Sequence, residues 1–282
     1  MVFESDVHGR SESIAWTAVP QPLRTAVEAC AGPVLATVPA SAGRTALLTL
    51  ALEVPEGRVF LKATPLSHRH ADTLKAEARV APIVAEISPR LLHHGTAGGW
   101  RWLLFEHVQG RHADLSPAST DLGAVAEVLQ HLATVKVPDI AGTLRIEERW
   151  AHLAGDLDLH PLAGDWLVHT DLNADNILVC DGGAAVLVDW ARPGHGAGWL
   201  STGFLLASII NAGTAPQVAE SWARQRLPVW AAAPDSAVDT FVAVLARRRA
   251  EQAEVCASWR RPERDGEFRS AQRWHAFRAT TT

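Results

Sequence analysis

The chain has 282 residues, of which 48% are hydrophobic and 20% are charged, and its formal net charge is -5 at pH 7. This composition indicates a globular protein with a sizeable core, and it excludes a general electrostatic attraction to nucleic acid. No apolar run approaches the roughly 20 residues of a membrane-spanning helix, and three widely spaced cysteines favour a reducing cytoplasm over a disulfide framework or a zinc site.

Strand-like segments dominate the first part of the chain, after an irregular stretch over residues 1–20 that carries no recognisable secretory signal. A helix is predicted over 22–30, because Gly32 and Pro33 end it. A longer helix over 66–87 is expected to kink or break at Pro82. The predicted strands cover residues 34–38, 45–54, 58–63, 91–94 and 100–105, with a hairpin turn at 55–57.

From residue 109 onward, helical patterns replace strand patterns, and only a hairpin over 177–190 interrupts them. Strands first and helices afterwards favour two lobes, which we place at 1–106 and 107–282. The predicted helices cover about 119–135, 145–155, 199–212, 216–226, 236–258 and 266–278.

The segment from His169 to Trp190 carries the most informative motif. It has the pattern H-x-D-x-x-x-x-N, then an apolar strand, a turn, a second apolar strand and an Asp. This order places Asp171, Asn176 and Asp189 at one end of a hairpin. Phosphoryl transfer of the kinase type needs one Asp that orients the attacking hydroxyl, with an Asn and a second Asp that hold magnesium.

This segment resembles the catalytic loop and the metal-binding Asp of the aminoglycoside phosphotransferase family. Thr170 stands where protein kinases usually carry Arg, and Trp190 stands where they carry Phe, which points to the small-molecule branch. The resemblance covers roughly residues 34–205. It implies an α+β, protein-kinase-like two-lobed fold, with a small β-rich N-terminal lobe and a larger, mostly helical C-terminal lobe.

The resemblance also implies an activity, which is transfer of the γ-phosphoryl group of ATP, or of GTP, to a hydroxyl with the help of Mg2+. Asp171 would be the catalytic residue, and Asn176 and Asp189 would be the metal ligands. His169 would brace the catalytic loop.

The resemblance also implies that a lysine in the first lobe binds the nucleotide phosphates. Lys62, one of three lysines in the chain, would bind the α- and β-phosphates. Glu77, in the following helix, would pair with it, and Glu86 is a weaker candidate for that role.

The other nucleotide contacts would come from the backbone. By resemblance, the Glu106 carbonyl and the Val108 amide would bond the adenine edge. Ser41 and Gly43 belong to the loop over 39–45 that would cover the phosphates. This loop has a single glycine, so the usual glycine-rich signature is missing.

The acceptor is expected to be a small hydroxylated molecule, first of all an aminoglycoside or another antibiotic, which would confer antibiotic resistance. An amino alcohol or a sugar is the alternative. Seven Asp and no Lys or Arg between 151 and 190 would suit magnesium and a cationic acceptor. No nucleic-acid, membrane or protein partner is indicated.

Two features of the C-terminal part bear on this expectation. The arginines from 247 onward are interpreted as solvated helix faces, and most of the tryptophans there as core. Relatives often carry an Asp near the start of the next helix. Residues 199–202 lack one, so the catalytic loop must be supported differently.

Three other readings stay open. A pseudokinase would bind nucleotide without chemistry, as the glycine-poor loop allows. A metallohydrolase could use His169, Asp171, Asp189 and His195. Dinucleotide binding at 194–198 is the weakest, because a helical pattern follows where a second strand should lie.

Overall fold

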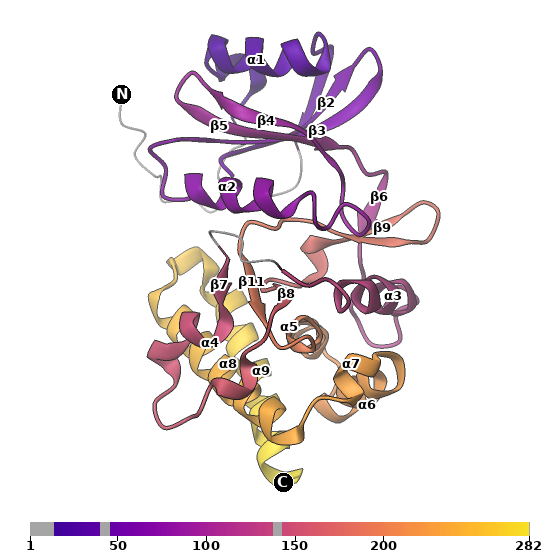
Figure 1. Cartoon of the computed structure of the whole chain (residues 1–282), viewed down its shortest axis with the longest axis vertical. Coiled ribbons are helices and arrows are strands. Elements are labelled where there is room, and N and C mark those ends of the chain that lie inside the picture. The colour runs from indigo at the N-terminus through magenta and orange to yellow at the C-terminus, as the bar shows by residue number, and fades with distance from the viewer. Residues whose placement is uncertain (1–13, 40–45, 138–142, 282) are drawn as a thin grey trace. The chain divides into compact units, whose positions relative to one another are not determined.

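The computed structural model describes residues 14–39, 46–137 and 143–281 (Figure 1). These residues divide into two compact units. The first comprises the described residues up to Ala85 together with Pro89–His107, and the second comprises Glu86–Ser88 together with the described residues from Val108 onward. The main boundary therefore lies between His107 and Val108, whereas the sequence-based division lies between residues 106 and 107.

The first unit is built on a five-stranded antiparallel sheet with the order β1-β2-β3-β5-β4. Its strands are β1 (Ala36–Pro39), β2 (Leu48–Val54), β3 (Gly57–Pro65), β4 (Leu91–Ala97) and β5 (Trp100–Glu106). All five predicted strands are present, and β1 begins two residues later than expected. The β2–β3 turn is tight because Gly57 adopts φ 130°, a conformation that favours glycine.

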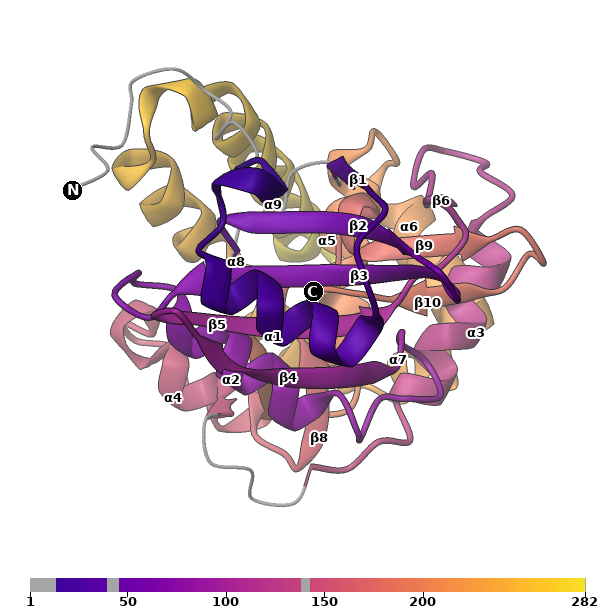
Figure 2. The same ribbon diagram turned by 90° about the horizontal axis from the view of Figure 1, so that it is seen from above.

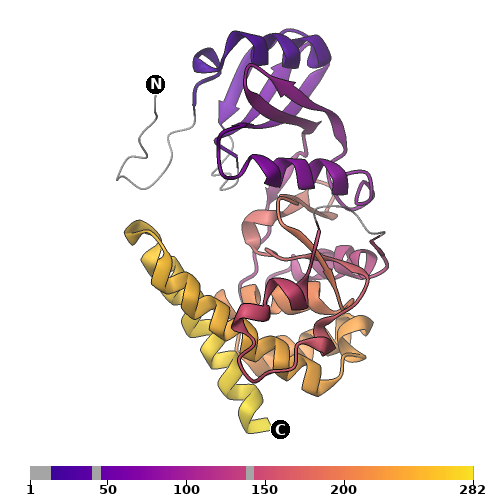
Figure 3. The same cartoon turned by 60° about the vertical axis from the view of Figure 1, so that its left-hand side comes forward.

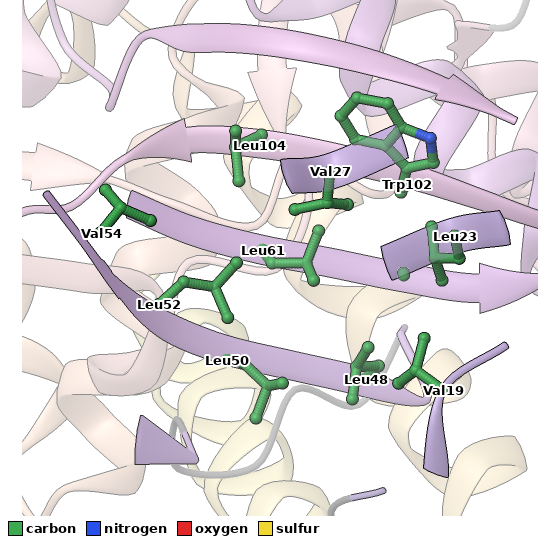
Figure 4. Packing of buried hydrophobic residues seen from close by; sticks show 11 residues of the cluster. Val19, Leu23, Val27, Leu48, Leu50, Leu52, Val54, Leu61, Trp102 and Leu104 are labelled. Atoms are coloured by element: carbon green, nitrogen blue, oxygen red, sulfur yellow. The ribbon is translucent and has the colours of Figure 1, made fainter. Parts of the chain in front are cut away.

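Two helices cover the two faces of this sheet. Helix α1 (Gln21–Ala31) packs Leu23 and Val27 on one face, against a layer that includes Leu61 (Figures 2 and 4). Helix α2 (Ala71–Val80) packs Leu74 against Leu103 on the other face. Because successive side chains of a strand alternate between faces, the residue after Leu61 points towards α2.

Helix α2 is shorter than the predicted helix over 66–87. The segments before and after it form turns, and the helical pattern ends ahead of Pro82. A proline after the helix cannot donate a backbone hydrogen bond, which is consistent with this end point.

The second unit combines two small sheets with a set of helices. One sheet has the order β10-β9-β6 and the other β7-β11-β8. The strands are β6 (Gly110–His112), β7 (Leu144–Arg145), β8 (Trp166–His169), β9 (Ile177–Cys180), β10 (Ala185–Leu187) and β11 (Pro193–Gly196). The α-helices are α3 (Leu122–Leu132), α4 (Ile146–Arg149), α5 (Leu200–Asn211), α6 (Pro216–Arg226), α7 (Pro228–Ala231), α8 (Asp235–Val255) and α9 (Arg261–Thr281).

The sequence-based expectation that only one hairpin interrupts the helices is wrong, because β6, β7, β8 and β11 are also present. The predicted helix over 145–155 is likewise only partly helical: it contains the end of β7, the single turn of α4 and a short 3-10 turn. Strand β11 escapes sequence reasoning because half of its residues are glycine. A Cβ at Gly196 would lie 2.7 Å from the Leu162 backbone carbonyl oxygen, so this close packing requires glycine.

Aromatic side chains form the core of the second unit. Trp150, which follows α4, stacks on Phe241 of α8 at 5.8 Å between ring centroids and meets Phe204 of α5 edge-on. Trp230 and Trp274 belong to the same core. Most of the C-terminal tryptophans are therefore core residues, as predicted.

The long helices α8 and α9 lie side by side (Figure 3). No helix within the described ranges has the length and apolar composition needed to cross a membrane.

Candidate active site

The β9–β10 hairpin brings the predicted metal-binding residues together. Its register pairs Leu187 with Ile177, and the next rung is the hydrogen bond from the Val188 amide to the Asn176 carbonyl, at 2.9 Å. Asn176 immediately precedes β9, and Asp189 follows β10 by two residues. The short strands thus carry both residues to the same end of the hairpin, as the motif predicts.

Asp171 is held beside this end by two asparagines. The Asn176 side-chain nitrogen donates to the Asp171 carbonyl at 2.8 Å. Asn173 donates to the Asp171 carboxylate at 3.2 Å, and its own side-chain oxygen accepts from the Asp175 amide at 2.9 Å. The Asp171 side chain is exposed, so its carboxylate is both oriented and accessible. Sequence reasoning did not assign a role to Asn173.

His169 braces the loop, as expected. Its Nδ1 accepts a hydrogen bond from the Asp171 amide at 3.3 Å, so Nε2 carries the hydrogen that it donates to the Val188 carbonyl at 3.0 Å. Its ring also meets the Trp190 ring edge-on, with centroids 4.5 Å apart. One buried imidazole therefore connects the loop before Asn176 to the segment that carries Asp189.

Helix α5 supports the same loop through two serines. The Ser201 hydroxyl accepts from the His169 amide at 3.1 Å, and the Ser208 hydroxyl donates to the Leu172 carbonyl at 2.5 Å. Residues 199–202 at the start of this helix contain no Asp. In its place, the Ser201 hydroxyl contacts the backbone at the start of the loop. Neither serine stood out in the sequence.

Asp189 has an unusual backbone conformation. Its φ is 63°, in the left-handed region that non-glycine residues rarely adopt, although Asp tolerates it better than most. Such conformations persist where the surrounding structure fixes them, and they concentrate at functional sites. The hydrogen bonds of Val188 on one side and the packing of Trp190 on the other supply that constraint.

Lys62 and Glu77 form a buried ion pair in the first unit. Lys62 Nζ lies 2.7 Å from Glu77 Oε1, and the two side chains are only 8% and 3% exposed. Lys62 lies on β3 and Glu77 on α2, which covers the face towards which Lys62 points. The alternative partner Glu86 belongs to the second unit and pairs with His131 at 2.9 Å.

The remaining nucleotide-contact residues are placed only in part. Glu106 ends β5, and its carboxylate pairs with Arg90. Val108 lies two residues further, outside any strand, and opens the second unit. Ser41 and Gly43 lie outside the described residues.

Arginine side chains lie close enough to Asp171 to interact with its charge, which the acidic composition of 151–190 did not suggest. Arg149 Nη1 lies 3.4 Å from the Thr170 hydroxyl, which itself donates to the Arg192 carbonyl at 2.7 Å. Burial lowers the pKa of the Arg149 guanidinium, and the charge of Arg192 acts in the same direction. The interpretation of the C-terminal arginines as solvated is also wrong for Arg248, which is half-buried over the Trp150 ring at 5.5 Å.

Arg249 and Arg264, whose side chains are 17% and 15% exposed, are also exceptions to that interpretation, and so is Arg278. Its side chain is 8% exposed and pairs with Glu220 at 3.0 Å and Asp239 at 2.6 Å. This network belongs to the core around α9 rather than to the candidate site.

The alternative site readings find little support. In the described part of the chain, no three His, Cys, Asp or Glu side chains are grouped so that they could hold a metal ion. This weighs against a metallohydrolase built on His169 and His195. The glycines at 194–198 do not form a phosphate-binding turn before a helix, because Gly194 and Gly196 lie in β11.

A β-sheet unit with a buried lysine–glutamate pair, followed by a unit with an Asp-containing loop and an Asn–Asp hairpin, defines a protein-kinase-like fold. No model of a known protein family matches the sequence, and no curated protein matches it. Solved structures do match, over nearly the whole chain.

The structural neighbours include small-molecule kinases. An aminoglycoside phosphotransferase from Alicyclobacillus acidocaldarius superposes with a TM-score of 0.59 at 14% identity, over 88% of this chain and 91% of that one. A thermostable mutant of aminoglycoside phosphotransferase APH(4)-Ia, in complex with ADP and hygromycin B, gives 0.60 at 13% identity, over 92% and 98%. Choline kinase LicA from Streptococcus pneumoniae gives 0.55 at 12% identity, over 90% and 98%.

The chain therefore has the fold of the aminoglycoside phosphotransferases and of choline kinase. The fold class predicted from the motif at 169–190 is confirmed.

Proposed function

We propose that the protein transfers the γ-phosphoryl group of ATP, or of GTP, to a hydroxyl of a small molecule, with the assistance of Mg2+. The observation that carries this proposal is the convergence of Asp171, Asn176 and Asp189 at one end of the β9–β10 hairpin. The fold of the neighbours, which include complexes with ADP and with AMP-PNP, supports a nucleotide as the donor.

The donor atoms of the hairpin fit a magnesium ion. Because the Asn176 nitrogen is engaged by the Asp171 carbonyl, its side-chain oxygen is the atom available to a ligand. That oxygen and the Asp189 carboxylate are hard ligands, and Mg2+ is commonly held by one or two such groups together with substrate phosphates. When bound there, the ion would neutralise charge on the phosphates.

Asp171 would accept a hydrogen bond from the acceptor hydroxyl and orient it for attack. The Asn173 contact fixes the carboxylate, and His169 fixes the backbone of the same residue. Lys62, paired with Glu77, would bind the nucleotide phosphates, and the backbone at Glu106 and Val108 would meet the adenine edge. Catalysis would then come from positioning and electrostatics rather than from a covalent intermediate.

The acceptor proposed from the sequence is an aminoglycoside or another antibiotic, with an amino alcohol or a sugar as the second candidate. The neighbours supply one example of each kind, since one is a complex with hygromycin B and another is a choline kinase. These compounds are known only for the neighbours. A first acceptor screen should therefore include both aminoglycosides and amino alcohols.

Nucleotide binding is tested by thermal unfolding of the full chain with and without Mg2+ and a non-hydrolysable ATP or GTP analogue. Ligand at about 100 times its dissociation constant stabilises by roughly 2.7 kcal/mol, which moves the midpoint by a few degrees. We expect a magnesium-dependent shift in the native protein that is lost in Asp189→Asn.

A second variant addresses the lysine. Lys62→Met combined with Glu77→Leu replaces the buried pair by apolar groups, so it removes the phosphate contact without leaving a buried charge alone. This double variant should also lose the magnesium-dependent rise in the unfolding midpoint. A shift without any turnover across the acceptor screen would favour the pseudokinase, and the absence of any shift would contradict the proposal.

A further inference from the structure

Three arginines from distant parts of the chain lie near the segment that precedes Asp171. Arg149 ends α4, Arg192 precedes β11, and Arg248 lies in the middle of α8. Arg149 reaches the Thr170 hydroxyl at 3.4 Å and the Arg192 carbonyl at 3.5 Å. Arg248 rests on the ring of Trp150, the residue after Arg149, at 5.5 Å.

The three positive charges act on one another. The pKa of Arg248 is lowered to about 9, first by burial and then by the charge of Arg149. Arg249 and Arg192 add to this effect, while the Asp171 carboxylate opposes it. Arg248 therefore stays protonated at neutral pH, at the cost of partial desolvation and like-charge repulsion.

The Asp171 carboxylate offsets this repulsion only in part. Among the described residues, none of the three guanidinium groups forms an ion pair, whereas the neighbouring Arg249 is paired with Glu267 at 2.9 Å and Arg247 with Asp156 at 3.1 Å. The Arg248 nitrogens have no hydrogen-bond partner there, yet none of them is sealed from solvent. They are placed to receive a ligand.

We infer that Arg149, Arg192 and Arg248 form a binding site for an oxyanion beside Asp171, and that the acceptor is a small hydroxylated molecule carrying a carboxylate or a phosphate ester. This inference rests on the proposed function for the role of Asp171. Guanidinium groups bind planar carboxylates and phosphates through paired, charge-assisted hydrogen bonds. A polycationic aminoglycoside would instead meet repulsion from the three arginines.

The spacing limits the size of the acceptor. Arg149 contacts the side chain of Thr170, and adjacent Cα atoms of Thr170 and Asp171 are about 3.8 Å apart. The Asp171 charge also acts on both Arg149 and Arg248, so an anion held by these guanidinium groups would lie near the carboxylate that would orient the hydroxyl. The hydroxyl and the anionic group of the acceptor should be separated by only a few bonds, as in a hydroxy acid or a small sugar phosphate.

The first experiment measures anion binding without any nucleotide. Thermal unfolding is followed in sodium chloride and in sodium phosphate at matched ionic strength, for the native protein, Arg248→Gln and Arg226→Gln. Arg226 is exposed at the end of α6, so its variant reports general salt effects. Phosphate should raise the midpoint of the native protein and of Arg226→Gln by a few degrees, and should raise that of Arg248→Gln by no more than about half as much.

Arg192→Gln provides a second variant, because the exposed Arg192 side chain can be changed without disturbing the core. It should lose at least about half of the phosphate shift, since one of three charged donors is removed. Equal phosphate shifts in all variants would overturn the inference. This result does not depend on turnover, so it is separable from a failure of the proposed function.

The second experiment compares acceptors in the presence of Mg-ATP. Glycerate, glycerol phosphate, choline and hygromycin B serve as probes, and the first two distinguish a carboxylate from a phosphate ester. We expect turnover of an anionic probe, with its KM raised about tenfold or more in Arg248→Gln, the factor that a charge-assisted hydrogen bond supplies. The KM for ATP should change less than about twofold.

Two outcomes would contradict this expectation. An equal rise in the KM for ATP would mean that the arginines bind the nucleotide phosphates instead. Turnover restricted to choline or hygromycin B, unaffected by Arg248→Gln, would show that the acceptor does not use the site.

Discussion

Lys62 and Glu77 carry opposite charges at a largely buried position. Their 2.7 Å contact joins β3 to α2, and both side chains are less than a tenth exposed. Each charge depends on the other, because an isolated charge at such a site has neither solvent nor a counterion. The pair is therefore both a proposed phosphate-binding device and a structural constraint.

Removal of one partner tests the structural part of this description. Glu77→Ala should lower the free energy of unfolding by about 3 kcal/mol, because it removes the carboxylate that the buried Lys62 contacts at 2.7 Å. Urea denaturation followed by circular dichroism measures the change. Lys62→Met with Glu77→Leu should recover most of the loss, and a loss below about 1 kcal/mol in Glu77→Ala would indicate that the pair is not desolvated.

At the scale of elements, the hairpin was predictable and the strands around it were not. The motif at 169–190 is local, since its strands are joined by one short turn and its register follows from that turn. Strand β8 pairs with β11 across more than twenty residues, and β11 consists largely of glycine and proline. Such a strand has no hydrophobic alternation, so only its packing reveals it.

The segment between β6 and α3 provides a prediction about pH. Arg111 donates two hydrogen bonds to the Asp121 carboxylate, at 2.6 and 2.7 Å, and the Asp114 amide donates a third at 2.8 Å. These bonds, with that of Arg111 first, lower the pKa of Asp121 from 3.8 to about 2, against the opposing effect of burial. As the pH falls, Asp121 therefore becomes protonated at a higher pH in the unfolded chain than in the folded chain.

The sign of the effect follows from this difference. The stabilisation from Asp121 is complete above about pH 4 and is lost as the pH falls towards 2. Asp121→Asn should consequently show a smaller loss of stability between pH 5 and pH 3 than the native protein, as measured by urea midpoints. Asp181→Asn, at an exposed turn, is the control and should retain the native pH dependence. An unchanged slope in Asp121→Asn would mean that the Arg111 contact is not formed in solution.

At the scale of the whole molecule, the sequence predicted the fold class because two local motifs lie in the expected order. Lys62 on a strand and Asp171, Asn176 and Asp189 on a loop and hairpin are each recognisable within short segments. The arrangement of charge around Asp171 was not predictable in the same way. Arg149 and Arg248 are about a hundred residues apart in the chain, so only the folded structure brings them to the same loop.

The same comparison explains why the sequence and the folded structure point to different acceptors. The acidic composition of 151–190 suggested a cationic substrate, but composition does not say which charges are near the reacting group. In the folded unit, the Asp171 carboxylate interacts electrostatically with two half-buried arginines, Arg149 and Arg248. The choice between a cationic and an anionic acceptor is therefore a question about tertiary structure.

The most direct test of the central claim is phosphoryl transfer itself. Formation of the phosphorylated acceptor from ATP is followed by phosphorus NMR for the native protein, Asp171→Asn and the control Asp181→Asn, whose carboxylate is exposed at the far end of the hairpin. We predict that Asp171→Asn lowers kcat by about a thousandfold, within the range for loss of a general base, while the magnesium-dependent nucleotide shift persists and Asp181→Asn stays near native. Near-native turnover in Asp171→Asn would contradict the assignment of this loop as the catalytic centre.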